Sequence, residues 1–207
     1  MNIFEKRHSV RKFKEEDVSN DLIKEIIRDA SYAPSGKNKQ NWHVVALKKQ
    51  SDKDMIMQSM TEKIEKLEKI SSNEELGKIK KMTPHLGWLT KAPVVFLIYA
   101  SDYIPTGYEM FLETDVESEE LGNLIATAPG IQNVGAFIEN LLLSASENGL
   151  GTCWMTAPMF ASKEITENLK INLPSYELTA MIPMGYPLSE EVPKKNRREV
   201  SEILTFL

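Results

Sequence analysis

Cysteine is nearly absent from this 207-residue chain, because Cys153 is the single one and no disulfide can form within the chain. One cysteine also cannot supply the several thiolates that bind structural zinc or an iron–sulfur cluster. The three histidines, His8, His43 and His85, are far apart and have neither HxxxH nor HxH spacing. We therefore predict no metal site, and the lack of disulfides is typical of a reducing compartment.

Long apolar segments and an excess of positive charge are missing as well. The longest apolar run, Ala92 to Ala100, is much too short to cross a bilayer, and the first residues lack the apolar core of a signal peptide. The formal net charge is −5, which argues against a dedicated nucleic-acid binder. These features predict a cytoplasmic protein with no membrane partner and no nucleic-acid partner.

Several familiar catalytic signatures are also absent, among them the P-loop, GxSxG and HExxH. Cys153 lies in an apolar stretch, which favours core packing over nucleophilic chemistry. Gly149 and Gly151 follow a helical pattern and precede a strand, whereas the dinucleotide fingerprint GxGxxG follows a strand and opens a helix. We interpret these glycines as a helix C-cap and a tight turn.

The composition is that of an ordinary globular protein, and the length fits one domain over residues 1–207. Apolar residues at helical spacing predict a helix that begins after a cap at Ser19 and further helices over Met55 to Leu67 and Ile131 to Ala145. Ser162 is expected to cap another helix, which runs through Leu169. β-branched apolar runs predict strands at Trp42 to Leu47, Pro93 to Tyr99, Thr152 to Thr156 and Leu178 to Met184. This alternation predicts an α/β or α+β protein with a covered sheet.

Three segments resist this assignment. Residues 71–87 are polar and have no clear period, and residues 101–128 form an irregular, acidic excursion. Residues 191–207 are a basic arm with an apolar tip. An apolar chain end usually docks on another surface, which points to a neighbouring subunit.

Positive charge is concentrated in three islands although the chain is acidic: residues 6–14, both sides of Asn38, and residues 194–198. A solvated surface explains any one of these islands. A phosphate, however, is bound by arginines together with hydroxyl or backbone donors, and Arg7 to Arg11 offers that set. His8 fits either an anion site or an exposed position.

The segment from Ala33 to Trp42 is dense in amide side chains. Amides both donate and accept hydrogen bonds, so they can recognise the edge of a heterocycle. The same residues also suit an ordinary turn that needs positive φ. The residues alone leave both interpretations open.

Two of these segments resemble motifs of one family. Arg7 to Phe13 is similar to the RxSxRxF signature of the nitroreductase family of FMN-dependent oxidoreductases. Ala33 to Trp42 resembles that family's APSxxNxQPW loop, with Asn41 where proline is usual.

Later segments resemble the same family in the same order. Asn133 to Leu143 and residues 149–154 are similar to its central helix and GLGTCW turn, with Glu139 in place of the commoner glutamine. Met184 to Pro187 and Lys195 to Arg197 resemble its GYP strand end and K-x-R tail. The match is weakest over residues 48–121.

The resemblance implies an α+β fold with a mainly antiparallel sheet of four to five strands flanked by helices. It also implies an intertwined homodimer with FMN at the interface, in which residues 191–207 wrap around the partner. The cofactor-binding residues it implies are Arg7, His8, Ser9 and Arg11 of the first motif; Pro34, Ser35 and Asn38 of the loop, partly from the other subunit; Met155, Thr156 and Ala157 after the central helix; and Lys195 and Arg197 of the tail, with Arg198 as an alternative one residue on.

The activity implied by the resemblance is the NAD(P)H-dependent reduction of nitroaromatic, quinone or similar electron-poor acceptors by a ping-pong hydride mechanism. No protein side chain is expected to act as a nucleophile, since the flavin carries the electrons. The alternatives are narrower chemistry on the same fold, such as reductive dehalogenation or the oxidation of a peptide, and a flavin sensor or storage protein without turnover. A protein that binds a different phosphate ligand is a further alternative.

Overall fold

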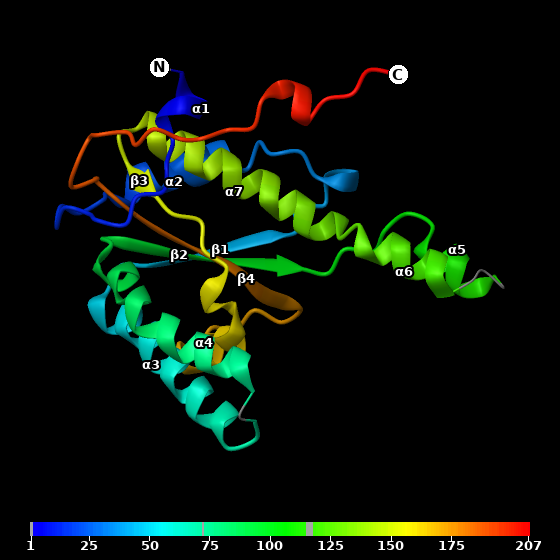
Figure 1. The fold of residues 1–207 in the computed structure, drawn as a ribbon, viewed down its shortest axis with the longest axis horizontal. Helices are drawn as coiled ribbons and strands as arrows, with labels where there is room; N and C mark the ends of the chain where they lie inside the picture. Colours follow the sequence, from blue (N-terminus) through cyan, green and yellow to red (C-terminus); the bar gives the residue numbers. More distant parts are fainter. Residues whose placement is uncertain (1, 72, 115–117) are drawn as a thin grey trace.

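A four-stranded antiparallel sheet lies between two layers of helices (Figure 1). The structure is a computed structural model that describes residues 2–71, 73–114 and 118–207. The sheet has the order β1-β2-β4-β3, and its strands are β1 (Trp42–Leu47), β2 (Val94–Ser101), β3 (Gly151–Thr152) and β4 (Tyr176–Gly185). The expected α+β class and the mainly antiparallel sheet are therefore confirmed.

The helices fall on both faces of this sheet, with α2 and α7 on one side and α3 and α4 on the other (Figure 1). The α-helices are α1 (Ile3–Lys6), α2 (Asn20–Ala30), α3 (Gln50–Glu68), α4 (Glu74–Met82), α5 (Tyr108–Glu113), α6 (Ser118–Ala126), α7 (Pro129–Glu147) and α8 (Ser162–Asn168). Short 3-10 turns are η1 (Gly36–Asn38), η2 (Thr83–Lys91), η3 (Ala157–Ala161) and η4 (Val200–Glu202). Within the described residues, no helix is both long and apolar enough to cross a membrane.

Strand β2 supports both layers because it is buried along almost its whole length. Successive side chains of a strand point to opposite faces of the sheet. Phe96 and Ile98 therefore pack into the core formed with α2 and α7, whereas Leu97 and Tyr99 pack into the second core, formed with α3, η2 and α8. Cys153 is buried in this second core, as its apolar context predicts.

The third strand is shorter than the expected Thr152 to Thr156, and Pro183 supplies the reason. The register pairs Thr152 with Met184, which brings Cys153 opposite Pro183. The Cys153 N–H donates to the carbonyl of Pro183 at 3.3 Å, but proline has no N–H to return. Pairing resumes only at Met155, whose backbone exchanges two hydrogen bonds of 2.9 Å with Met181.

The predicted cap at Ser19 is confirmed, since its Oγ accepts a hydrogen bond from the Leu22 N–H. The predicted cap at Ser162 is wrong. Ser162 is already the first residue of α8, because the turn η3 leads directly into the helix and Ala161 occupies the cap position without a side-chain bond.

Two segments without an expected period contain helices. Residues 71–87 include α4 and the start of η2, and Asn73 caps α4 by accepting from the Leu76 N–H. The excursion 101–128 is not irregular throughout, because α5 and α6 form a pair that projects away from the sheet (Figure 1). Residues 115–117 of this excursion lie outside the described residues.

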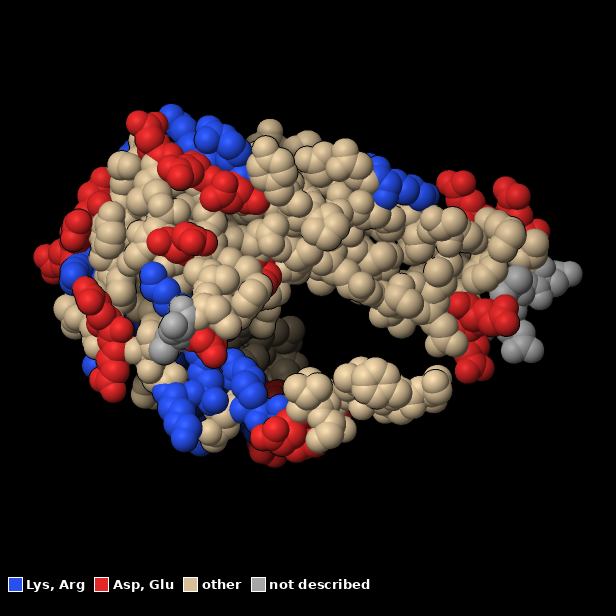
Figure 2. All heavy atoms as spheres, turned by 90° about the horizontal axis from the view of Figure 1, so that it is seen from above, with Lys and Arg blue, Asp and Glu red and all other residues tan. Residues whose placement is uncertain are grey.

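The C-terminal arm, residues 191–207, crosses the same side of the molecule as α1 and α7 (Figure 1). In Figure 2 its tan, uncharged end stands apart from the rest of the molecule across an open hollow. Phe206 is 88% exposed and Val200 is 65% exposed, so the apolar tip does not pack on its own chain.

The buried carboxylate of Glu164 joins α8 to α3, on the face of the sheet opposite to α7. Oε1 of Glu164 accepts from the ammonium groups of Lys63 and Lys66, at 3.3 and 3.4 Å. Burial by itself raises the pKa of Glu164, but a backbone hydrogen bond and the two lysines outweigh it and the pKa is lowered. The ionised form is therefore the one that stabilises this contact.

We expect Glu164→Gln to lower the free energy of unfolding by about 1–3 kcal/mol at neutral pH, because Lys63 and Lys66 would then face a neutral amide in place of a carboxylate. A lowered pKa in the folded state means that the stabilisation is complete above the ordinary glutamate pKa. It is lost as the pH falls through that value to the lower folded pKa. Urea unfolding between about pH 7 and about pH 3 should therefore be less pH-dependent in Glu164→Gln than in the wild type. Glu167→Gln on the exposed side of α8 is the control, and equal pH dependence of all three proteins would contradict the assignment.

Candidate functional site

The N-terminal segment is attached to the edge of the sheet by its backbone. Ser9 forms a parallel β-bridge with Thr152, and the Val10 N–H donates to the Thr152 carbonyl at 2.8 Å. The Val10 side chain fills the space beside Gly151, where a Cβ would lie only 2.6 Å from Val10 Cγ2. The second glycine of the turn after α7 is therefore required for the segment to dock.

This docking places the first motif between two hollows. Arg7, His8 and Val10 line an enclosed cavity, which is described below. Ser9 and Arg11 line an open hollow of about 820 Å³. His8 reaches this hollow as well, and its Nδ1 lies 3.0 Å from the carbonyl of Lys6.

The C-terminal arm brings Lys195 to Arg7, and it brings Arg197 close enough for its charge to act on Lys195. The ammonium of Lys195 donates to the carbonyl of Glu5 at 3.0 Å and also to the carbonyl of Arg7, 188 residues away in the sequence. The pKa of Lys195 is lowered, first by partial burial and then by the neighbouring positive charges of Arg7 and Arg197. We call Arg7, Lys195 and Arg197 the cationic cluster.

A carboxylate of α7 lies next to this cluster. Oε1 of Glu139 is 3.6 Å from Nε of Arg7, and its negative charge partly offsets the lowering of the Lys195 pKa. In the sequence, Glu139 stands out because the family's motif usually has glutamine at this position. The contact of Glu139 with Arg7 was not predicted.

The segment after β3 contacts α7 one helical turn from Glu139 and on the same face of the helix. A Cβ at Gly135 would lie 3.7 Å from the indole of Trp154. Gly135 and Glu139 are four residues apart, so they lie on one face of the helix, about 6 Å apart along its axis. The indole of Trp154 thus lies on the same side of α7 as the cationic cluster, whereas η3, which follows it, packs against α3, α8 and β4.

The predicted cofactor residues of this segment differ in exposure. Met155 is buried and paired with Met181, so its side chain belongs to the core. Thr156 and Ala157 are exposed at the start of η3.

The amide loop is fixed by a buried asparagine. Asn41 is only 1% exposed, its Nδ2 donates to the carbonyls of Ser101 and Gly130, both at 3.1 Å, and its Oδ1 accepts from Asn133 at 2.9 Å. Asn133 in turn accepts from the N–H of Gly36 at 3.1 Å. This network joins the loop to β2 and α7, and it explains why asparagine replaces the family's usual proline, which cannot form these bonds.

The loop residues expected to bind cofactor lie apart from the cationic cluster within the chain. Pro34 and Asn38 are exposed, and Ser35 accepts a hydrogen bond from the backbone of Gln40. In the part of the chain that the structure describes, the loop's side-chain hydrogen bonds stay within the loop or run to β2 and α7.

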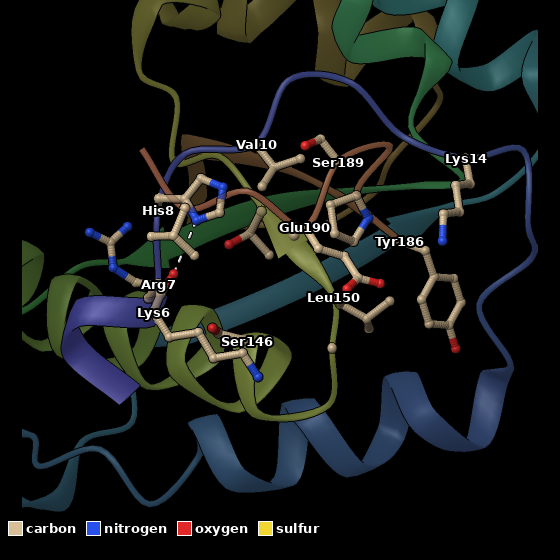
Figure 3. A pocket seen from close by; sticks show the side chains of 15 residues that line it. Lys6, Arg7, His8, Val10, Lys14, Ser146, Leu150, Tyr186, Ser189 and Glu190 are labelled. Atoms are coloured by element: carbon tan, nitrogen blue, oxygen red, sulfur yellow. Dashed lines mark hydrogen bonds between the residues drawn. The ribbon is translucent and has the colours of Figure 1, made fainter. Parts of the chain in front are cut away.

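A more enclosed cavity of about 310 Å³ lies behind the N-terminal segment (Figure 3). Val10, Leu150, Tyr186 and Glu190 are among the side chains that line it. Figure 3 shows the guanidinium of Arg7 directed away from this cavity. Arg7 is nonetheless one of the residues that line the cavity, so the cavity adjoins the cationic cluster.

Comparison with known proteins agrees with the fold and with the motifs. The model of the Nitroreductase family matches residues 4–186, and the chain belongs to this family. An iodotyrosine deiodinase of Hydra vulgaris is 26% identical over 206 residues, which are 96% of this chain and 69% of the relative. A putative NAD(P)H nitroreductase of Bacillus subtilis, YfhC, is 24% identical over 95% of this chain and 88% of its own length.

A solved structure supports the same assignment. The BluB-like flavoprotein of Clostridium difficile 630 is 36% identical and superposes with a TM-score of 0.86, covering 99% of this chain and 97% of that one. Family membership and these relatives support oxidoreductase chemistry of the flavin type.

We expect Asn41→Ala to lower the free energy of unfolding by about 2–4 kcal/mol, because one buried and two partly buried hydrogen bonds are lost. Chemical denaturation gives this value, and limited proteolysis should cut faster within residues 34–40. Asn172→Ala, at an exposed position, is the matched control. If both variants are equally stable, the network does not fix the loop.

Proposed function

We propose that this protein binds FMN and is an NAD(P)H-dependent oxidoreductase that reduces nitroaromatic, quinone or similar electron-poor acceptors. The observation that carries the proposal is the cationic cluster, in which Lys195 and Arg197 of the C-terminal arm add their charges to Arg7 of the N-terminal segment. Three cations beside one carboxylate leave excess positive charge, and this fits a phosphate group. Family membership and the flavoprotein relative support a flavin as the carrier of that phosphate.

Each group of residues has its own part in this proposal. Arg7 and Arg197 would bind the phosphate, while Lys195 holds the N-terminal segment in place through the carbonyls of Glu5 and Arg7 and adds its charge. Ser9 and Arg11 line the adjoining hollow, where a hydroxyl and a guanidinium suit the ribityl chain and the pyrimidine edge of a flavin. His8 has access to the same hollow.

The remaining predicted residues fit a site that two subunits share. Thr156 and Ala157 are exposed at the start of η3, where their backbone is accessible to a ring system. Among the described residues, the hydrogen bonds of the loop that contains Pro34, Ser35 and Asn38 run within the loop or to β2 and α7, and none joins it to the cationic cluster. We therefore assign them to the site of the second subunit in a homodimer.

The apolar tip of the C-terminal arm supports this dimer. Phe206, Ile203 and Leu204 are exposed, and burying each such side chain against a partner contributes ~1.5–3 kcal/mol. The hollow between the arm and the body in Figure 2 is where a second subunit would fit.

The bound flavin would supply the redox chemistry, accepting a hydride from NAD(P)H and passing electrons to the acceptor. The protein contributes the environment of that reaction. Arg11 places fixed positive charge in the hollow, where it would stabilise negative charge that develops on the pyrimidine side. Exposure of Thr156 and Ala157 leaves room for donor and acceptor to bind in turn.

Reductive dehalogenation is a second candidate, because the relatives include iodotyrosine deiodinases of several animals and of Thermotoga neapolitana, each matching nearly the whole chain. A cavity of about 520 Å³ between the end of β2, α5 and the start of α7 is lined by Tyr103 and Tyr108. Such a cavity suits an aromatic acceptor.

We expect the purified protein to be yellow and to release FMN and not FAD, because it has one phosphate-binding cluster and no fingerprint for a second nucleotide. Chromatography of the released cofactor tests this. Stopped-flow oxidation of NADH and NADPH, followed by addition of a quinone, a nitroaromatic or iodotyrosine, then identifies the acceptor class. Release of FAD would overturn the cofactor assignment. Bound FMN with no turnover of any acceptor would favour a sensor or storage role.

We expect Arg197→Ala to weaken FMN binding roughly ten- to a hundredfold, since a charge-assisted hydrogen bond to phosphate contributes about 1.5–3 kcal/mol. Arg198→Ala is the matched control, because Arg198 is exposed and is not among the charges that act on Lys195. Fluorescence titration of the flavin-free proteins measures both. A larger loss in Arg198→Ala would move the phosphate ligand one residue along the arm.

A further inference from the structure

Helix α7 places a carboxylate directly beside the cationic cluster. Oε1 of Glu139 lies 3.6 Å from Nε of Arg7, and 45% of the glutamate side chain is exposed. The ion pair uses Nε, so the two terminal nitrogens of the guanidinium are left to donate to a second anion. Glu139 therefore holds Arg7 from the side without occupying its terminal donors.

The charges of this group can be counted. Arg7, Lys195 and Arg197 carry three positive charges, and Glu139 reduces the sum to two. A phosphate monoester carries about −1.5 to −2 at neutral pH, so the group with Glu139 matches it closely. The glutamine that is commoner in the family at this position would leave three uncompensated cations.

Glu139 acts in opposite directions in the two states of the site. Without a bound anion, three neighbouring cations repel one another, and the carboxylate relieves that repulsion. With a phosphate bound, the same carboxylate repels the ligand. A residue of this kind stabilises the empty site and weakens its hold on the ligand.

We propose that Glu139 is a specificity-determining residue of the phosphate subsite, which keeps Arg7 in position before the cofactor binds and limits the affinity for the flavin phosphate. The inference rests on the proposed function, because it takes FMN as the ligand. Glu139 touches no reacting atom in this assignment and acts through Arg7 and through its charge.

The test compares Glu139→Gln with wild type, with Glu139→Asp and with Glu147→Gln, an exposed position about two turns further along α7. Flavin-free proteins are titrated with FMN and with riboflavin, which lacks the phosphate, at low and high salt. Thermal unfolding of the same proteins is measured with and without inorganic phosphate.

We expect Glu139→Gln to bind FMN roughly three- to tenfold more tightly at low salt, with riboflavin affinity unchanged. The gain should shrink at high salt because screening weakens it. Without ligand this variant should unfold at a lower temperature, and inorganic phosphate should raise its midpoint more than that of the wild type. Glu139→Asp should restore the wild-type values, and Glu147→Gln should retain them. Damage to the fold would instead weaken both flavins.

Equal or weaker FMN binding by Glu139→Gln, or a parallel change for riboflavin, would overturn the inference. If none of the four proteins binds either flavin, the proposed function fails. The role of Glu139 is then tested by how much inorganic phosphate raises the midpoint of thermal unfolding. A larger phosphate effect in Glu139→Gln than in the wild type then supports its role, and an equal effect overturns it.

Discussion

The backbone contact between the N-terminal segment and the edge of the sheet is the interaction on which the candidate site depends. The Val10 N–H donates to Thr152, and the Val10 side chain occupies the space that Gly151 leaves open. This register places Ser9 and Arg11 at the open hollow, and it places Arg7 and Val10 at the enclosed cavity. A shift by one residue would turn Val10 away from Gly151, because the side-chain period of extended backbone is two.

The elements with strong local patterns could be predicted from the sequence. Strand β2 is a continuous apolar run, and α7 repeats its apolar residues at helical spacing over five turns, so both were expected close to where they lie. The expected third strand was too long because composition alone ignored the missing N–H of Pro183, which faces Cys153 across the sheet. The helices α5 and α6 are short and lie in an acidic stretch, where the apolar period is too brief to stand out.

The candidate site shows the same difference between local and long-range information. Local motifs predicted Arg7, Ser9 and the amide loop, because the chemistry of those residue types can be recognised within one segment. The contacts that organise them join distant parts of the chain: Glu139 to Arg7, Lys195 to the carbonyl of Arg7, and Asn41 to Asn133. A carboxylate or an amide has many possible partners in a sequence of this length, and only the packing of α7 against the sheet selects one.

The contact of Lys195 with the carbonyl of Arg7 also has a consequence for biosynthesis. A chain is synthesised from its N-terminus, so Arg7 is translated 188 residues before Lys195. The sheet and both of its helical layers are already translated when Lys195 and Arg197 emerge, so these last cations are added to a scaffold that is otherwise present. The proposed phosphate subsite is thus completed only after this scaffold has been translated, and a chain truncated before residue 195 would keep strands β1 to β4 but lack two of the three proposed cations.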